Sequence, residues 1–419
     1  MIKVGIIGVG TVGTSVAQIL KSNADVISAR AGQEIVVKSG VVKNLKKDRG
    51  LDIIITDNVE TILNDEEIDI VVELMGGVDE AFEVVKKALS KGKSVVTANK
   101  ALLAYHRYEL QDLAKDNAFE YEAAVAGGIP IINALRDGLT ANHIESIVGI
   151  MNGTCNYMMT EMANNGVAYD AILKEAQDLG YAEADPEFDV GGYDAAHKLL
   201  ILSSIAYGID AKPEDILIEG IQNVSSEDVA FAKEFGYAIK LLTIAKKDGS
   251  EVELRVHACL ISKEEMIAKI DGVMNGVSVV GDKVGETLYY GPGAGGDATA
   301  SAVIADIISI ARAGKSSPML GFDKPMEGKL TLKPSANIES KYYLRINVSD
   351  KAGVLAKITK IFEVHNISVE TMLQKSTSNS SANLLISTHI AKESDIQAMM
   401  NELEALDFVN EKPNMIRIF

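Results

Sequence analysis

Cysteine is scarce in this chain of 419 residues, with only Cys155 and Cys259 present, and tryptophan is absent. Two cysteines are too few for a disulfide framework or a cysteine metal cage, which fits a reducing cytoplasm. Long apolar runs are also lacking, because none approaches the ~18 residues that a membrane span needs. Met1 leads into a strand pattern and not into a basic and then apolar leader. We therefore expect a cytoplasmic protein without a membrane partner.

Basic charge is in deficit as well. The 41 lysine and arginine residues face 59 aspartate and glutamate residues, which gives a formal net charge of −18. Nucleic acids and anionic membranes bind basic surfaces, so this balance argues against both partners and favours a small-molecule ligand. With 47% hydrophobic residues, the chain has room for two or three domains at ~150 residues each.

The N-terminal pattern is typical of a dinucleotide-binding unit. A buried strand at residues 3–7 is followed at once by GVGTVG and a helical pattern. Gly8 permits a tight turn, Gly10 lets the backbone approach a pyrophosphate, and Gly13 lets the helix meet the strand. A chance glycine turn is the alternative. The cofactor-binding residues predicted in this turn are Gly8, Gly10, Thr11, Val12 and Gly13.

Strand and helix patterns continue to alternate up to about residue 123. This order predicts a Rossmann-type parallel sheet, in which the carboxyl ends of the strands line the cofactor crevice. Thr97 and Lys100 follow one such strand and are therefore candidates for cofactor binding. For Lys100, a solvent-exposed lysine at a helix start is the alternative. The expected strands are residues 34–42, 53–56, 68–74 and 94–98.

The end of the second strand carries a cluster of lysines that bears on coenzyme choice. Lys43, Lys46 and Lys47 stand where an NAD enzyme commonly places an acidic residue for the ribose hydroxyl. Basic side chains there favour the 2′-phosphate of NADP. A solvated basic loop is the alternative, and use of both NAD and NADP remains open.

Residues 180–202 combine a loop rich in carboxylates with an apolar helix. We expect Pro186 and two glycines to keep the loop from becoming helical. Asp194 and Lys198 then lie one helical turn apart, among neighbours that are almost all apolar. A surface salt bridge is one interpretation. The apolar surroundings favour buried ions beside a cleft that holds a small polar ligand and can move a proton.

Two glycine-rich segments could contact ligands through their backbones. The stretch EAAVAGGIPI, residues 122–131, is a turn whose carbonyls could hold a monovalent cation, with an ordinary tight turn as the alternative. The stretch GPGAGG, residues 291–296, could pass over a bound nicotinamide at Gly293, or could be a mere loop. A helix is expected at about residues 298–315, and we expect it to pack on the N-terminal domain.

The C-terminal segment has the order strand, helix, strand, strand, helix, strand, which is the ferredoxin-like pattern. Asp350, Gly353 and Val354 lie at the start of its first helix, a place suited to the carboxylate and amine of an amino acid. A pure dimerisation module is the alternative, because its edge strands could pair with a second copy. The fold class is therefore α/β with a C-terminal ferredoxin-like domain. The expected domains are residues 1–135 for NAD(P) binding, 136–324 for an α+β substrate and dimerisation domain, 325–341 for a linker, and 342–419 for a regulatory domain.

The chain resembles homoserine dehydrogenase over nearly its whole length. The resemblance rests on the motifs GVGTVG, VVELMGG, TANKALLA, NGTCNY, YAEADPEFDVGGYDAAHKL and GPGAGGDATASAVIAD, in the order and spacing of that family. The module around DKAGVLAKI is similar to an ACT domain, a sensor of small molecules. Three departures stand out: Lys43 replaces a frequent Arg, Cys155 a usual Thr, and Ala352 a common Pro.

The resemblance implies roles for individual residues. Lys198 matches the proton donor and Lys100 the second active-site lysine, although which of them donates stays open. The carbonyls of four residues match a sodium site: Glu122, Val125, Gly127 and Ile129. The substrate-binding residues implied are Glu183, Asp189, Asp194 and Lys198.

The implied reaction is the reversible reduction of L-aspartate 4-semialdehyde to L-homoserine with NAD(P)H, in a homodimer or homotetramer. L-threonine is the implied effector, and we expect a chain truncated near Ser335 to stay active but unresponsive to it. An acylating semialdehyde dehydrogenase that uses Cys155 as its nucleophile is one rival. A cofactor-sensing regulator without turnover is another.

Overall fold

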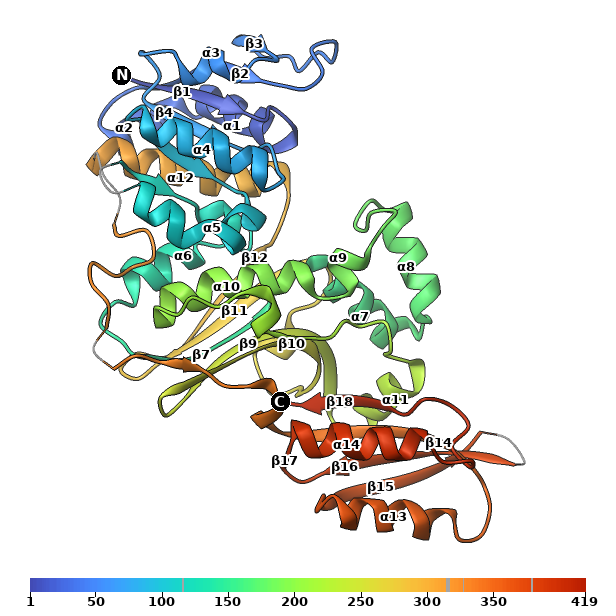
Figure 1. The fold of residues 1–419 in the computed structure, drawn as a ribbon. Coiled ribbons are helices and arrows are strands. Elements are labelled where there is room, and N and C mark those ends of the chain that lie inside the picture. Colours follow the sequence, from blue (N-terminus) through green and yellow to red (C-terminus); the bar gives the residue numbers. More distant parts are fainter. Residues whose placement is uncertain (115–116, 314–316, 327, 378–379) are drawn as a thin grey trace. The chain divides into compact units, whose positions relative to one another are not determined.

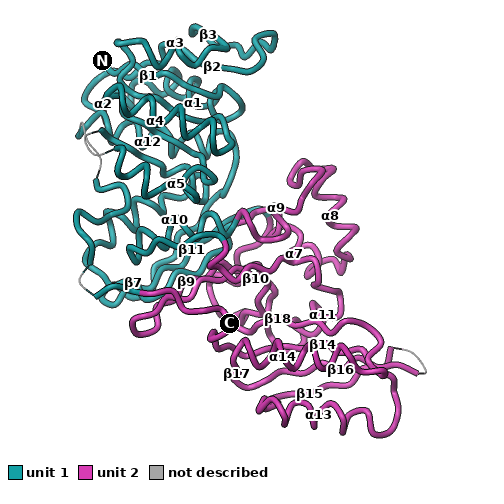
Figure 2. Tube along the Cα trace, viewed as in Figure 1, with its two compact units in different colours: residues 1–151, 195–213, 273–330 teal, residues 152–194, 214–272, 331–419 magenta. Residues whose placement is uncertain are grey.

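The computed structural model describes residues 1–114, 117–313, 317–326, 328–377 and 380–419. The chain forms two compact units (Figure 2). Unit 1 comprises Met1–Met151, Ala195–Pro213 and Val273–Leu330, and unit 2 comprises Asn152–Asp194, Glu214–Gly272 and Thr331–Phe419. Within the described residues, no helix combines the length and apolar character needed to cross a membrane.

Unit 1 contains the predicted Rossmann-type sheet, in which all neighbouring strands pair in parallel. The strand order is β3-β2-β1-β4-β5-β6, with the order reversing beside β1, where such folds bind dinucleotides. The predicted fold class is confirmed here. The strands are β1 (Ile2–Ile7), β2 (Ile35–Val41), β3 (Ile54–Thr56), β4 (Ile70–Glu73), β5 (Ser94–Thr97) and β6 (Phe119–Glu120).

Helices cover this sheet, and one of them comes from far along the chain (Figure 1). Val303 and Ile307 of α12 share a buried core with Val4 and Ile6 of β1 and with Val16 of α1. The helix therefore belongs to the same core as the first strand. It begins two residues before the predicted start, and residues 314 and 315 of the prediction lie outside the described residues. The helices are α1 (Thr11–Ser22), α2 (Ala24–Ala31), α3 (Glu60–Leu63), α4 (Asp79–Ser90), α5 (Lys100–Leu113) and α12 (Gly296–Ala313).

The rest of unit 1 is a short helical segment and an antiparallel group of strands. The segment comprises α6 (Ile131–Asn133) and a wider turn at Ala134–Gly138. The strands β7 (Ile144–Ile150), β11 (Met274–Gly281) and β12 (Gly285–Pro292) pair in the order β7-β11-β12. Helix α10 (Tyr193–Tyr207) belongs to unit 1 from Ala195 onward.

Unit 2 begins with helices and a long hairpin. The hairpin strands β9 and β10 pair in antiparallel register over their whole lengths. The loop before α10 was expected to stay non-helical, but Glu187–Val190 forms the helical turn α9. Pro186 precedes that turn, where its missing N–H costs no hydrogen bond, so it starts the turn and does not prevent it. The elements are α7 (Gly153–Asn165), α8 (Tyr169–Asp178), α9 (Glu187–Val190), α11 (Ser226–Glu234), β8 (Leu217–Ile218), β9 (Tyr237–Asp248), β10 (Glu251–Ser262) and β13 (Thr331–Leu332).

The C-terminal module has the predicted ferredoxin-like fold, with strand order β18-β14-β16-β15. Its helices pack on one face of the sheet, where Leu344, Ile346 and Ile358 are fully buried. The edge strand β18 is not available to pair with a second copy of the module, because it pairs in parallel with β10 of the same chain. The prediction that both edges of this sheet are free for dimerisation is therefore wrong for β18. The elements are β14 (Glu339–Ser349), α13 (Val354–Val364), β15 (Val369–Ser376), β16 (Ser381–Thr388), β17 (Ala391–Lys392), α14 (Glu393–Glu404) and β18 (Asn414–Ile418).

The segment expected to be a linker, 325–341, is largely ordered where it is described. Thr331 and Leu332 pair with β10, and β14 already begins at Glu339. Residue 327 lies outside the described residues.

Candidate active site

The glycine-rich turn after β1 has the geometry of a pyrophosphate cradle. A Cβ atom at Gly8, where φ is 104°, would lie 2.4 Å from the Leu74 carbonyl oxygen, and one at Gly13 would lie 2.5 Å from the Gly8 carbonyl oxygen. Both positions are therefore closed to larger residues. At Gly10 nothing lies within 4 Å of such an atom. Gly10 lies directly before the first turn of α1, where the backbone N–H groups of Thr11 and Val12 have no acceptor within the helix. A pyrophosphate could therefore approach the backbone at Gly10.

Arg49 fixes the basic loop after β2 to this turn. Its Nε donates to the Val9 carbonyl at 2.7 Å, and its Nη1 donates to the carbonyls of Asn44 at 3.1 Å and Lys47 at 2.7 Å. Lys43 is exposed, and Lys47 lines a cavity of about 300 Å³ in the same loop. Sequence reasoning missed Arg49, although it ends the lysine cluster.

The polar side chains at the carboxyl ends of β4 and β5 form hydrogen bonds with one another. Thr97 is fully buried, and its hydroxyl donates to Glu73 at 2.6 Å and accepts from the Asn99 backbone N–H at 3.0 Å. Burial raises the pKa of the Glu73 carboxyl. The Asn99 side chain caps α5 by accepting from the Leu102 N–H at 3.1 Å. Lys100 is the first residue of that helix, so these bonds set its position beside the strand ends.

The turn at residues 122–131 packs on the loop after β12. Gly127 has a φ of 51°, and a Cβ atom there would lie 2.6 Å from the Gly293 carbonyl oxygen. The Glu122 carboxylate accepts from two N–H groups at the start of α6, each at 2.8 Å, and burial raises its pKa to about 7. In the described part of the chain, no group of three His, Cys, Asp or Glu residues could hold a metal ion. An ion in this turn would therefore rest on backbone carbonyls.

In unit 2, one amide holds two of the predicted substrate carboxylates together. Asn152 Nδ2 donates to Asp189 at 2.8 Å and to Asp194 at 2.9 Å, while its Oδ1 caps α7 by accepting from the Cys155 N–H at 2.8 Å. Asp194 is buried and Asp189 is half-buried. Glu183, in contrast, is exposed in the preceding loop. Asn152 was not singled out from the sequence, although it opens the NGTCNY motif.

Lys198 lies inside an apolar part of α10. The predicted burial of this helix is confirmed, because residues 195, 196 and 199–202 are at most 1% exposed and Lys198 itself is 8% exposed. Its Nζ donates to the Met151 carbonyl at 2.6 Å. A buried ammonium with a fixed backbone acceptor has a defined position, which a proton donor requires.

Three family descriptions match the chain: "Homoserine dehydrogenase, NAD binding domain" over residues 8–123, "Homoserine dehydrogenase" over 130–308, and "ACT domain" over 342–408. The homoserine dehydrogenase of Helicobacter pylori is 54% identical over 418 residues, covering 100% of this chain and 99% of that relative. This chain belongs to the homoserine dehydrogenase family. A crystal structure of a homoserine dehydrogenase from Thiobacillus denitrificans has a TM-score of 0.92 and 46% identity, covering 100% of this chain and 98% of that chain.

Homoserine dehydrogenase is an NAD(P)-dependent oxidoreductase that acts on a CH–OH group, and the predicted enzyme class is confirmed. A further relative of solved structure is a hyperthermophilic archaeal homoserine dehydrogenase in complex with NADPH, at 29% identity and a TM-score of 0.63. The alignment covers 74% of this chain and 97% of the archaeal chain. About a quarter of the present homoserine dehydrogenase therefore has no counterpart in that relative.

Both cysteines of this homoserine dehydrogenase are buried. Cys155 is fully buried, and its thiol donates to the Asp189 carbonyl at 3.3 Å. Burial raises the pKa of the Cys259 thiol to about 12.

The predicted effector residues lie at the start of α13. Gly353 is the residue before the helix and has a φ of 90°, which favours glycine. The Asp350 carboxylate accepts from Gln374 Nε2 at 3.2 Å, and Val354 is buried. Two of the three residues are thus engaged within the ACT module itself.

Proposed function

We propose that this homoserine dehydrogenase catalyses the reversible reduction of L-aspartate 4-semialdehyde to L-homoserine. The observation that carries the proposal is the pair of carboxylates, Asp189 and Asp194, held by the Asn152 amide. Buried carboxylates are retained when a cation or donors compensate them. The α-ammonium group of the substrate would add a cation to the partners that these carboxylates already have, and the exposed Glu183 would attract it from solvent.

Lys198 is the proposed proton donor. Reduction of the aldehyde places negative charge on its oxygen, and Lys198 Nζ gives a proton to that oxygen as the C–O bond becomes a single bond. The proton is replaced from solvent. Lys100 is the proposed second lysine, whose charge would help to stabilise the alkoxide. The bound coenzyme supplies the hydride.

The coenzyme would be held by the turn Gly8–Gly13, with its pyrophosphate at the N-terminus of α1 and its nicotinamide near Gly293. Thr97 would act by positioning, since its hydroxyl is already bound to Glu73. We also propose a sodium ion on the carbonyls of Glu122, Val125, Gly127 and Ile129. L-threonine as effector and assembly into a homodimer or homotetramer complete the proposal.

Lys43 is expected to decide between the two coenzymes. Lys43→Ala should raise the KM for NADPH about tenfold, as for the loss of ~1.4 kcal/mol in one charge-assisted hydrogen bond, and should leave the KM for NADH nearly unchanged. The matched control is Lys21→Ala, which removes an exposed lysine of α1. Initial rates with each coenzyme measure the difference. Equal changes for both coenzymes would show that Lys43 does not contact the 2′-phosphate.

Replacement of Cys155 separates simple reduction from the acylating rival. A thiol nucleophile would form a covalent thioester and would require phosphate to release the product. We expect Cys155→Ser to keep at least about half of the wild-type kcat, because the serine hydroxyl can still donate to the Asp189 carbonyl. Rates are measured with and without phosphate. A loss of about a thousandfold, or a dependence on phosphate, would favour the rival.

A further inference from the structure

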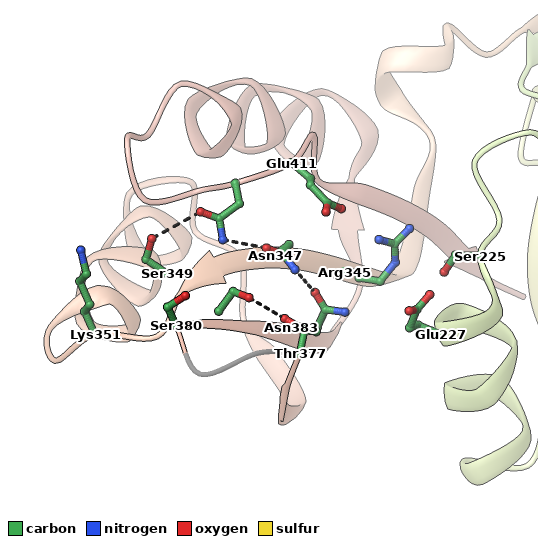
Figure 3. Close-up of a pocket in the computed structure, with 12 residues that line it drawn as sticks. Ser225, Glu227, Arg345, Asn347, Ser349, Lys351, Thr377, Ser380, Asn383 and Glu411 are labelled. Atoms are coloured by element: carbon green, nitrogen blue, oxygen red, sulfur yellow. Dashed lines mark hydrogen bonds between the residues drawn. The ribbon is translucent and has the colours of Figure 1, made fainter.

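The ACT module carries a wide polar pocket on the face of its sheet opposite its two helices. The pocket has a volume of about 800 Å³, within the range of small-molecule sites. Asn347 of β14 and Asn383 of β16 form its floor, and Glu227 of α11 and Lys351 stand at its two ends (Figure 3). Asn410 also lines the pocket.

Strand alternation makes this face polar. Along β14, Leu344, Ile346 and Val348 point into the core under the helices, so Asn347 and its neighbours of the same parity point to the other face. Here the asparagines form an ordered row. Asn410 Nδ2 donates to Asn347 Oδ1 at 2.8 Å, and Asn347 Nδ2 donates to Asn383 Oδ1 at 2.7 Å.

The row ends in a donor directed into the pocket. Asn383 is 6% exposed, and in the described part of the chain no hydrogen bond is formed by its amide nitrogen, which points along the floor toward Arg345 (Figure 3). This amide donor lines the open pocket, where a ligand can reach it. An acceptor atom of a bound ligand would satisfy it.

The wall of this pocket belongs to the part of the chain that matches the catalytic family description. Asp228 of α11 is fully buried and accepts from the Tyr343 hydroxyl at 2.8 Å, from Arg345 Nε at 2.9 Å and from Asn414 Nδ2 at 3.0 Å. These bonds tie α11 to β14 and β18. Helix α11 also packs against α7, whose first residues follow the carboxylate-binding Asn152.

We propose that this pocket, and not the start of α13, is the effector site, and that its ligand is a zwitterionic amino acid. Arg345 suits a carboxylate, Glu227 beside it suits an ammonium group, and the Asn383 amide suits a polar side chain (Figure 3). The inference rests on the threonine regulation proposed above and assigns that regulation to this pocket. A ligand here touches both the ACT sheet and α11, so it can alter the position of α7 and of the carboxylates that Asn152 holds.

Calorimetric titration of the full chain with L-threonine tests the site directly, with D-threonine as the control ligand. We expect Asn383→Ala and Glu227→Gln each to weaken binding about tenfold, as for one lost hydrogen bond. Glu227 is exposed, so its variant should fold even if the Asn383 variant does not. Asp350→Ala should leave the Kd within about twofold. The matched control is Lys360→Ala, on the exposed side of α13, with binding and activity unchanged.

Two results would overturn the inference. One is loss of threonine binding in Asp350→Ala with binding retained in Glu227→Gln, which would return the site to the start of α13. The other is no heat of binding for millimolar L-threonine to the wild-type protein. Because binding is measured without turnover, an active enzyme that binds no threonine would refute the pocket alone. A chain that binds threonine but reduces no semialdehyde would refute the catalytic proposal alone.

Discussion

Replacing Lys198 with methionine should lower kcat for semialdehyde reduction by a factor of about 10²–10⁴, the usual contribution of a positioned proton donor. Methionine fills a similar volume, so the apolar packing around this 8%-exposed residue is kept while the ammonium is lost. The KM for the coenzyme should change little. Steady-state rates and coenzyme affinity, measured on the same preparation, separate the loss of chemistry from a loss of binding.

The control for this experiment is Lys174→Met. Lys174 is an exposed lysine of α8 whose ion-pair partner, Asp178, lies one turn further along the same helix. It should behave like the wild type. If Lys198→Met kept near-normal turnover with intact coenzyme binding, Lys198 would not be the donor. A much larger loss in Lys100→Met than in Lys198→Met would assign the donor role to Lys100.

Arg417→Leu should destabilise unit 2 by about 3–5 kcal/mol, the cost of breaking a buried ion pair from one side. Arg417 is 1% exposed; its Nη1 and Nη2 donate to Glu219 at 2.7 and 2.9 Å, and its Nε and Nη2 donate to Glu393 at 2.9 and 2.6 Å. Burial alone would raise the pKa of Glu393, but the hydrogen bonds from Arg417 outweigh it and lower that pKa. Leucine would leave both carboxylates without their cation.

Urea unfolding of the two proteins measures this effect. Lys341→Leu is the matched control, because it breaks an exposed ion pair with Glu370 in the same module and should cost no more than about 1 kcal/mol. Arg417→Leu should also raise the KM for the semialdehyde. Glu219 begins the segment in which the Ile221 N–H donates to the Val190 carbonyl at 2.9 Å, next to Asp189. Unfolding of Arg417→Leu at the same urea concentration as Lys341→Leu would contradict this account.

The same contacts change what is expected of a shortened chain. Truncation near Ser335 would remove β18 from the side of β10 and would leave Glu219 without Arg417. Loss of stability, and not merely loss of the threonine response, is therefore the expected result.

Local patterns were enough to predict the elements that create the candidate site. The spacing of Gly8, Gly10 and Gly13 between a strand and a helix specifies one turn, and the apolar surroundings of Lys198 specify a buried helix. The glycine-rich turn and the buried helix each depend only on residues that are close together in the sequence. The ferredoxin-like order of the C-terminal segment follows in the same way from alternating periodicities.

The missed residues act over long distances in the sequence. Arg49 binds a carbonyl 40 positions away, Asn152 joins carboxylates 37 and 42 positions away, and Arg417 reaches a partner 198 positions away. A single arginine or asparagine carries no periodic signal, so nothing in the local pattern identifies its partner. The pairing of β18 with β10 was missed for the same reason, since both strands satisfy the same alternation with any neighbour.

The most direct test of the catalytic account is the reaction of the purified chain with L-aspartate 4-semialdehyde and NADPH or NADH in phosphate-free buffer. Coenzyme oxidation is followed by absorbance, and the products are identified by chromatography. The account predicts that L-homoserine forms in an amount equal to the coenzyme oxidised, with either coenzyme or both. Absence of oxidation with both coenzymes, or oxidation without homoserine, would contradict it.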